Sequence, residues 1–443
     1  MNIQGRRILY LFCIIIFFVI TLIIILYALG YKYNWPKKTL ERTGVFFIKS
    51  YPKNASIYIN DIKQKKETPN LINRLLPNYY QVRVNKEGYL DWQKTLPIAP
   101  QTTTFIEDIS LFKKQLEPEL IITEAFASFL QSANKIYVIF YKEEGNSLWL
   151  LNLINDELTE LYQSSSIKPL ELISWSNNNQ KVLIRQNNKY FILNINQKNL
   201  LYSLDETAEL AFSSLVWDTY NDNILYGISN QKLYQLDLLN KKADLLSTLP
   251  ALAVINYKTD VLAIIKNQNK YLLNFIKNEK EPLLSLPYSL NYQFANQGDG
   301  IVTLFDKEQK TLYLLEPENG SQPVKAVINN VEDFKCHDNQ FLFWNNNELW
   351  VYYANINQKT LVERTSQPIV SAFWHPNIVY IYGQTANELK VYELDNRDQR
   401  NIYTLINFET PDNNLVFTNK KGDYLYLIAE IGGQSGLYKV EVQ

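Results

Sequence analysis

The chain has 443 residues, which exceeds the size of one ordinary domain, so we expect two or three domains. It carries 44 lysines and arginines against 45 aspartates and glutamates, a net charge of -1. Proteins that bind nucleic acid normally present a basic face or tail, so this balance argues against a nucleic-acid partner. Aromatic residues make up 14% of the chain, which favours β-strands. Two cysteines, Cys13 and Cys336, are too few for a disulfide framework.

Residues 8–29 form an uninterrupted apolar segment without a charge or a proline. A helix of about 20 residues crosses a hydrocarbon core of about 30 Å, so we predict that this segment spans the lipid bilayer, after a short basic tail at 1–7. A cleaved signal peptide ending at Gly30 is the alternative, although its apolar region would span about 7–15 residues. The aromatic residues that suit an interfacial belt at the end of this segment are Tyr27, Tyr31, Tyr33 and Trp35.

Positive charges flank the predicted helix on both sides, so the positive-inside count is nearly balanced. They are Arg6 and Arg7 before the helix, and Lys32, Lys37, Lys38 and Arg42 in the juxtamembrane linker 30–43 after it. Long domains are translocated largely regardless of charge. We therefore predict a single-pass membrane protein with its N-terminus in the cytoplasm and its body outside. A scaffold that faces the cytoplasm is the alternative.

Residues 44–112 alternate between polar and apolar side chains, as β-strands do. The alternation is clear at Ile57 and Ile59 and again at Val82 and Val84. We predict a compact antiparallel β-sandwich in this region, followed by a linker at residues 113–118.

The order of motifs in residues 44–112 resembles the PEGA domain. The matching motifs are Ser50-x-Pro52-x-x-Ala55, then Thr68-Pro69, then Gly88-Tyr89. Two departures are Lys66-Glu67 in place of the glycine before Thr-Pro, and Asn78 in place of a later glycine. The resemblance implies a noncatalytic, exported module of the bacterial cell envelope. We expect Thr68-Pro69 and Gly88-Tyr89 to be fold determinants, with Gly88 supplying a bend and Tyr89 packing.

From about residue 118 the sequence repeats a unit of four short strands separated by turns rich in asparagine and aspartate. The first strand of the unit recurs at intervals of 38–44 residues, which is the period of a β-propeller blade. The aligned positions are Trp175, Trp217, Ile255, Phe294, Phe334, Phe373 and Phe417. Trp175-Ser176 followed by Val182-Leu183-Ile184 is similar to the repeats of TolB-like propellers, a resemblance that implies a fold and no function.

The last copy of the repeat, residues 415–442, lacks a fourth strand, and the strand 119–124 stands before the first copy without partners. We predict that this strand completes the last blade, because ring closure removes open sheet edges. The count is then eight blades, with seven as the alternative. The predicted fold is therefore mainly β, with a transmembrane helix, a small antiparallel sandwich and a propeller over residues 119–443.

No residue cluster in the sequence predicts a catalytic, cofactor-binding or metal site, and we assign none. Asp218, Asn221, Asp222 and Asn223 share one turn but lack the spacing of an EF-hand loop, so we interpret them as turn-forming residues. The same interpretation applies to Asp395, Asn396 and Asp398.

The remaining candidates are also explained by the fold. His337 and His375 lie in predicted turns without a nearby nucleophile motif. Cys336 precedes His337 directly, and adjacent strand residues face opposite sides, so the two do not form a dyad. Trp175, Trp217 and Trp374 recur at one strand position, which predicts packing between blades.

The sequence therefore favours a noncatalytic membrane-anchored envelope protein, in which a PEGA-like spacer presents a propeller that binds a protein or a glycan. The rival is a hydrolase or lyase whose site lies in the central channel, because such a site draws residues from several blades and leaves no linear motif. Three converging carboxylates, or His375 beside one, would favour the enzyme. A broad exposed apolar patch would favour a binding module.

Overall fold

The computed structural model shows a mainly β protein with one long helix in the described part of the chain. It describes residues 3–443 except 124–125, 167, 206–208, 269, 278–280, 298–299, 321 and 409–414. The chain folds into two compact units. The first contains residues 1–117, 393–403 and 441–443, and the second contains 118–392 and 404–440. Two short segments that the predicted domain division placed in the propeller therefore group with the N-terminal unit.

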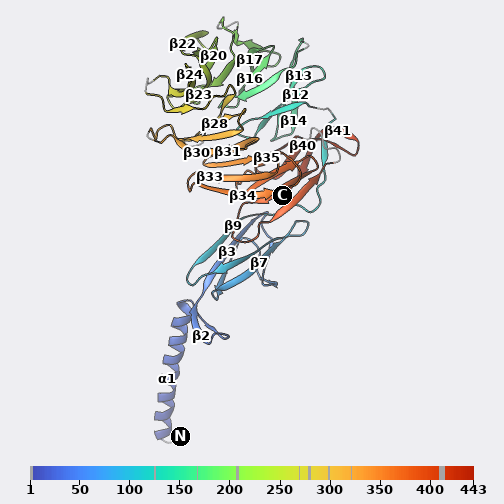
Figure 1. Ribbon diagram of the computed structural model, residues 1–443. Helices are drawn as coiled ribbons and strands as arrows, with labels where there is room; N and C mark the ends of the chain where they lie inside the picture. Colours follow the sequence, from blue (N-terminus) through green and yellow to red (C-terminus); the bar gives the residue numbers. More distant parts are fainter. Residues whose placement is uncertain are drawn as a thin grey trace. The chain divides into compact units, whose positions relative to one another are not determined.

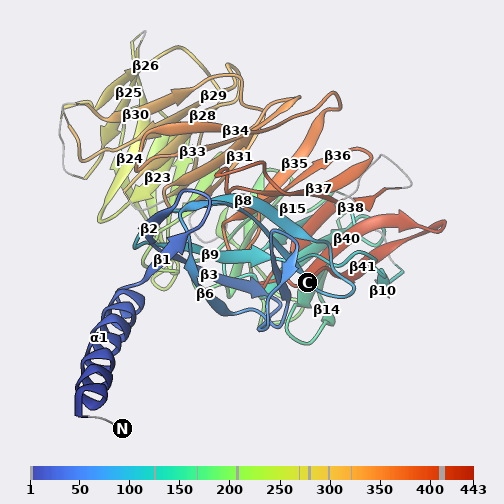
Figure 2. The same ribbon diagram turned by 90° about the horizontal axis from the view of Figure 1, so that it is seen from below.

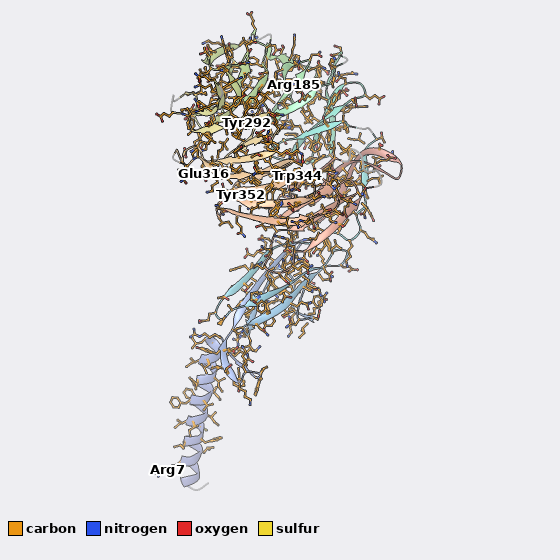
Figure 3. The ribbon with its side chains drawn as sticks, in the orientation of Figure 1. Arg7, Arg185, Tyr292, Glu316, Trp344 and Tyr352 are labelled. Atoms are coloured by element: carbon orange, nitrogen blue, oxygen red, sulfur yellow. The ribbon has the colours of Figure 1, made fainter. Side chains whose placement is uncertain are left out.

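Helix α1 (Ile3–Ala28) begins just before Arg7 and contains the apolar stretch Leu9–Ala28, which is long enough to cross a membrane (Figures 1 and 3). None of the stretch Leu9–Ala28 is buried, so its apolar side chains are not part of a protein core. A helix of this kind serves as a membrane anchor or as a signal sequence. The predicted apolar helix is thus present.

The segment predicted as a linker is a two-stranded hairpin. Strands β1 (Tyr31–Asn34) and β2 (Thr39–Arg42) pair antiparallel, and Figure 1 shows this hairpin projecting sideways from the C-terminal end of α1. The amide and the hydroxyl of Thr43 both donate to Gly30 O, which joins the two ends of the hairpin.

The sandwich of the first unit consists of two sheets that enclose one apolar core. The sheet orders are β6-β3-β9 and β5-β4-β7-β8. The strands are β3 (Gly44–Tyr51), β4 (Ser56–Ile59), β5 (Ile62–Lys63), β6 (Asn70–Leu75), β7 (Asn78–Asn85), β8 (Trp92–Ile98) and β9 (Thr103–Ser110). The prediction of a wholly antiparallel sandwich was wrong, because β3 and β9 pair in parallel. The four strands of the other sheet lie between them in sequence and supply the long connection that a parallel pair requires.

Strand β8 was not predicted, although its residues alternate regularly between buried and exposed. Lys94 occupies one of the buried positions, between Trp92 and Leu96, and this charged residue hides the apolar pattern. The predicted bend at Gly88 is present, with a φ of +80°, and Tyr89 packs against the sandwich core. Asn78, in contrast, is the first residue of β7 and does not have a positive φ.

Buried hydroxyl groups join the two PEGA-like motif segments. Ser50 Oγ and Thr68 Oγ1 lie 2.6 Å apart, and Ala55 N donates to Thr68 Oγ1 at 3.1 Å. The Thr68 amide in turn donates to Ala55 O at 2.9 Å. The Ser-x-Pro-x-x-Ala turn and the Thr-Pro motif are therefore one hydrogen-bonded structure, which gives both motifs a structural role.

We expect Thr68→Val to lower the free energy of unfolding of the first unit by about 1–3 kcal/mol, because it leaves the Ser50 hydroxyl and the Ala55 amide without this buried partner. Urea unfolding followed by intrinsic fluorescence measures the change. Thr103→Val, at an exposed position of β9, is the matched control and should shift the value by less than about 0.5 kcal/mol. Equal shifts in the two variants would contradict the structural role of the Thr68 hydroxyl.

A buried ion pair lies inside the first unit, between β8 and the segment 393–403. Lys94 Nζ lies 3.2 Å from Glu393 Oε2, and the two side chains are 0% and 6% exposed. Lys94 Nζ also donates to Asp395 O at 2.7 Å and to Gln399 O at 3.3 Å. The ammonium group is thus surrounded by oxygen acceptors, as a buried charge requires.

The carboxylate of Glu393 is equally well provided with donors. Trp92 Nε1 donates to Glu393 Oε1 at 2.9 Å, and Asn401 Nδ2 donates to Oε2 at 2.8 Å. A second contact of the same segment is made by Asp398, whose Oδ2 accepts a hydrogen bond from Thr95 N at 2.6 Å. The segment 393–403 is therefore held by specific polar contacts rather than by apolar packing alone.

The rest of the chain forms eight four-stranded antiparallel sheets from the described residues, an arrangement consistent with a β-propeller. The first four are β11 (Ser128–Gln131), β12 (Tyr137–Lys142), β13 (Ser147–Asn152) and β14 (Glu157–Gln163); β15 (Glu171–Trp175), β16 (Lys181–Gln186), β17 (Lys189–Asn194) and β18 (Leu201–Ser203); β19 (Ser214–Trp217), β20 (Ile224–Ser229), β21 (Lys232–Asp237) and β22 (Lys242–Ser247); β23 (Ala251–Tyr257), β24 (Asp260–Asn267), β25 (Lys270–Phe275) and β26 (Leu284–Leu286).

The other four sheets continue the same order along the chain (Figure 2). They are β27 (Tyr292–Gln297), β28 (Val302–Asp306), β29 (Thr311–Leu315) and β30 (Val324–Ile328); β31 (Asp333–His337), β32 (Gln340–Trp344), β33 (Glu348–Tyr353) and β34 (Gln358–Arg364); β35 (Ile369–Trp374), β36 (Tyr380–Thr385), β37 (Glu388–Glu393) and β38 (Ile402–Asn407); and β39 (Leu415–Thr418), β40 (Tyr424–Ile431) and β41 (Gln434–Glu441) with β10 (Glu119–Ile122).

Strand β10 pairs antiparallel with β41, so the first strand of this region joins the last sheet. Glu124, the last residue of the predicted strand, lies outside the described residues. In each of the other seven sheets the four strands are consecutive in sequence. Neighbouring sheets touch through their first strands, for example β11 with β15 and β31 with β35. The first strands therefore form the inner part of this propeller-like region.

The recurring tryptophans link neighbouring sheets. Trp175 Nε1 donates to Leu130 O at 3.0 Å, and Trp374 Nε1 donates to Lys335 O at 3.1 Å. In both cases the acceptor lies on the first strand of the preceding sheet. Trp217 is buried in the apolar core formed by β16 to β21. These positions have the packing role that their spacing predicts.

Candidate interaction sites

The acidic turn between β19 and β20 is held by its own side chains. Asp218 Oδ1 accepts hydrogen bonds from the amides of Tyr220 and Asn221, and Asn221 Oδ1 accepts one from Asn223 N. Asp218 Oδ2 accepts the Tyr226 hydroxyl at 2.9 Å. Asp218 and Asn221 therefore have the turn-forming role that we predicted. Asp222 Oδ1 and Asn223 Oδ1 instead accept hydrogen bonds from Asn178 N and Lys181 Nζ of the preceding sheet.

In the second predicted turn, Asp395 has the same role, whereas Asp398 Oδ2 accepts a hydrogen bond from Thr95 N of β8. Asp395 Oδ1 accepts a hydrogen bond from Arg397 N, and the Arg397 guanidinium binds both carboxylate oxygens. Burial acts to raise the pKa of Asp395, but the hydrogen bonds from Arg397 outweigh it and lower the pKa overall.

The two histidines lie in different environments. His375 is buried, its Nδ1 accepts a hydrogen bond from Asn377 N at 3.2 Å, and its ring packs against Tyr380 and Tyr382. These contacts are those of a core side chain. His337 is half exposed, with Nε2 lying 3.6 Å from Asp338 Oδ2. Among the residues that the structure describes, no group of three or more His, Cys, Asp and Glu side chains converges as a metal site would require.

An inner groove of about 730 Å³ runs beside the first strands β27 and β31. Phe305, Phe334 and Cys336 line it, and lysines and carboxylates line it as well. Burial raises the pKa of the Cys336 thiol to about 12, so the thiol is protonated at neutral pH. A protonated thiol is a poor nucleophile, which argues against Cys336 as a catalytic nucleophile.

An outer groove of about 700 Å³ lies between the sheet β15–β18 and the sheet β19–β22. Most of its apolar lining comes from β18, at Leu201 and Tyr202, and from the turn after β21, at Leu238 and Leu239, and Ile192 and Leu204 complete it. Tyr202 and Leu239 are exposed. The groove therefore combines exposed apolar side chains with β18, which is the last strand of its sheet.

The charged residues that line the outer groove are Lys181 and Lys241, and no acidic residue lines it in the described part of the chain. Lys181 Nζ donates to Asp222 O at 3.0 Å and to Asn223 Oδ1 at 2.7 Å. Burial lowers the pKa of Lys181, although the charge of Asp222 opposes this effect. The groove thus combines apolar side chains with two lysines and with the uncharged polar residues Asn194, Gln197, Ser203 and Asn223.

Sequence reasoning did not find the outer groove because its residues come from two different repeats. A usable signal was the exposed aliphatic residue in the turn after the third strand, which occurs as Leu153-Ile154-Asn155 and again as Leu238-Leu239-Asn240. Ile154 and Leu239 are 75% and 74% exposed. Leu239 lines the outer groove.

Comparisons with known proteins identify part of the first unit. Residues 43–110 match the family model described as the PEGA domain. The predicted resemblance is thereby confirmed, at bounds within two residues of 44–112. The PEGA match covers the two-sheet sandwich and does not extend into the propeller-like region. No curated protein matches the chain significantly.

Solved structures that resemble the chain are distant from it in sequence. A chain in a crystal structure of the mitotic checkpoint complex aligns with 74% of this chain and 91% of its own length, at 10% identity and a TM-score of 0.42. A chain in a crystal structure of the eukaryotic initiation factor aligns with 72% of this chain and 89% of its own length, at 10% identity and a TM-score of 0.49. The propeller-like fold is therefore assigned from the strand pairing alone.

Proposed function

We propose that the chain is a noncatalytic scaffold of the bacterial cell envelope, which α1 anchors in a lipid bilayer and whose propeller binds an extended segment of a partner protein. The apolar length of α1 supports the anchor, and the PEGA match supports the envelope location. The N-terminus lies in the cytoplasm and the body lies outside. The propeller has eight blades, and β10 closes the ring by pairing with β41.

The outer groove is the observation that carries the binding role. The last strand of a sheet accepts an added strand, and side-chain pockets beside it then provide specificity. Leu201, Tyr202 and Leu239 offer such pockets, and Lys181 and Lys241 favour acidic residues in the partner. Most of the apolar lining is aliphatic rather than aromatic, which suits a peptide better than a sugar, because sugars stack on aromatic rings. The partner segment therefore combines apolar and acidic residues.

Photo-crosslinking in intact cells tests the groove. A crosslinker at position 202 of the full chain should capture a specific protein, and one at position 154 should not. Leu239→Asp should reduce the yield at position 202 by tenfold or more, since it places a like charge against an acidic partner. Ile154→Asp is the matched control at equal exposure and should leave the yield unchanged. Equal losses in both variants would contradict the assignment of the groove.

The orientation needs a separate measurement. Protease is added to cells whose outer layer is permeable to it, while the membrane that α1 spans stays intact. It should digest the body of the chain and leave α1 with its N-terminal residues protected. Protection of the whole body until the membrane is opened would contradict this orientation and favour a scaffold that faces the cytoplasm.

A further inference from the structure

The hairpin that follows α1 has two chemically different faces. In an antiparallel pair, residues that are directly opposite share a face, and alternate residues along each strand do so as well. The pairs Tyr31 with Arg42 and Tyr33 with Leu40 therefore form one face. The pairs Lys32 with Glu41 and Asn34 with Thr39 form the other.

The polar face is closed by internal hydrogen bonds. Asn34 Nδ2 donates to Glu41 Oε2 at 3.0 Å, and the Thr39 hydroxyl donates to Glu41 Oε1 at 3.2 Å. Lys37 Nζ lies 3.2 Å from the same carboxylate. This network neutralises Glu41, the one acidic residue of the hairpin, so the remaining charges on it are positive.

The aromatic face, in contrast, is exposed. Trp35 is 79% exposed and its ring meets that of Tyr33 edge-on at 4.9 Å, while Tyr33 and Leu40 are also exposed. The Arg42 guanidinium lies 5.1 Å from the ring centre of Tyr31. It also donates a hydrogen bond to Gln101 Oε1. An exposed cluster of tyrosine, tryptophan and leucine bordered by arginine and lysine has the composition of the membrane–water interface.

The short connection to α1 keeps the aromatic face close to the end of that helix. Only Leu29 and Gly30 separate α1 from β1. The Arg74 guanidinium lies 3.2 Å from the ring centre of Tyr27 in the last turn of α1, and Lys32 Nζ donates to Arg74 O at 3.4 Å. The hairpin leaves the end of α1 sideways (Figure 1), so it runs beside the surface from which α1 emerges.

We propose that the β1–β2 hairpin is a second membrane contact, which inserts its aromatic face into the headgroup layer of the bilayer that α1 spans and binds anionic lipid through its basic residues. The inference rests on the anchoring role proposed for α1 and adds the part that the hairpin plays. Lysine and arginine side chains are attracted to an anionic lipid surface, so the basic residues of the hairpin add to the attachment.

Spin labels on the full chain in vesicles of phosphatidylcholine with a minority of phosphatidylglycerol test the proposal. Cys13 and Cys336 are first replaced by serine, and single labels are placed with Leu40→Cys, Thr39→Cys or Ile20→Cys. Residues 39 and 40 are adjacent and lie on opposite faces, so they form a matched pair. The label at 40 should be more accessible to oxygen than to a water-soluble nickel complex, and the label at 39 should show the reverse.

The label at 20 separates failure of the proposal from failure of the anchor. If it is buried in lipid while labels 39 and 40 are both accessible to nickel, the anchor stands and the hairpin contact is refuted. If the label at 20 is itself accessible to nickel, the anchor fails and the hairpin proposal fails with it. Trp35→Ser should move the label at 40 toward water, and Trp35→Phe should leave it in place.

Discussion

Replacing Lys94 with methionine should greatly increase the fraction of molecules in which the segment 393–403 is detached from β8. The substitution keeps the length of the side chain but leaves the Glu393 carboxylate buried without its cation. Removing one partner of a buried ion pair costs about 3–5 kcal/mol, because the remaining charge is not compensated. The loss far exceeds that expected for a surface pair, which is worth about 0–1 kcal/mol.

Native-state trypsin cleavage measures this opening directly, since the segment contains Arg397 and Arg400. When opening is fast relative to cleavage, the cleavage rate follows the open population, so about 3 kcal/mol corresponds to a rise of roughly a hundredfold. Lys49→Met, at an exposed position of β3, is the control and should leave the rate unchanged.

The double variant Lys94→Met with Glu393→Met gives the sharper test. It removes both charges and retains volume, and such replacements are often neutral or stabilising. The double variant should therefore be cleaved more slowly than Lys94→Met alone. Cleavage of the double variant at least as fast as the single variant would show that the ion pair itself is not the source of the effect.

Gly436→Ala should destabilise the last sheet by disturbing the strand that completes it. A Cβ at position 436 would lie against the carbonyl oxygen of Ile122 and the side chain of Leu120, closer than van der Waals contact allows. Both of those residues belong to β10, so the strand must shift away from β41. Overpacking of this kind costs about 1–3 kcal/mol.

Thermal unfolding and light scattering of the purified chain together check this prediction. A displaced β10 exposes the edge of β41, and open edges promote association between molecules, so the variant should also self-associate. Ser435→Ala, at the neighbouring exposed position, is the matched control and should change stability by less than about 0.5 kcal/mol. Unchanged stability and solubility of Gly436→Ala would contradict the proposed role of β10 in closing the ring.

Local patterns predicted some elements nearly to the residue. The apolar segment 8–29 corresponds to α1 because a run of apolar residues long enough to span a bilayer is visible without any partner. The motifs at Ser50 and Thr68 identified the PEGA-like region because they are short and ordered along the chain. The repeat period predicted four-stranded sheets because each sheet is built from consecutive strands.

Elements that depend on distant partners were missed. Strand β8 was hidden by Lys94, whose inward position makes sense only opposite Glu393, about 300 residues later in the chain. The parallel pairing of β3 with β9 was missed because alternation specifies which side chains are buried and not which strand lies alongside. The hairpin at residues 31–42 was missed for a different reason, since its strands are neighbours in sequence and its turn has no glycine to mark it.

The sequence by itself determined that an apolar helix precedes a PEGA-like sandwich and an array of repeats. Hydropathy, alternation and period are properties of neighbouring residues, so they can be read along the chain. The missing fourth strand of the last repeat also predicted that β10 joins β41. Only the tertiary structure decided that residues 393–403 belong with the first unit, and that Tyr202 and Leu239 line one groove. Each of these depends on contacts between residues far apart in sequence, where burial of specific side chains selects the partner and no local pattern does.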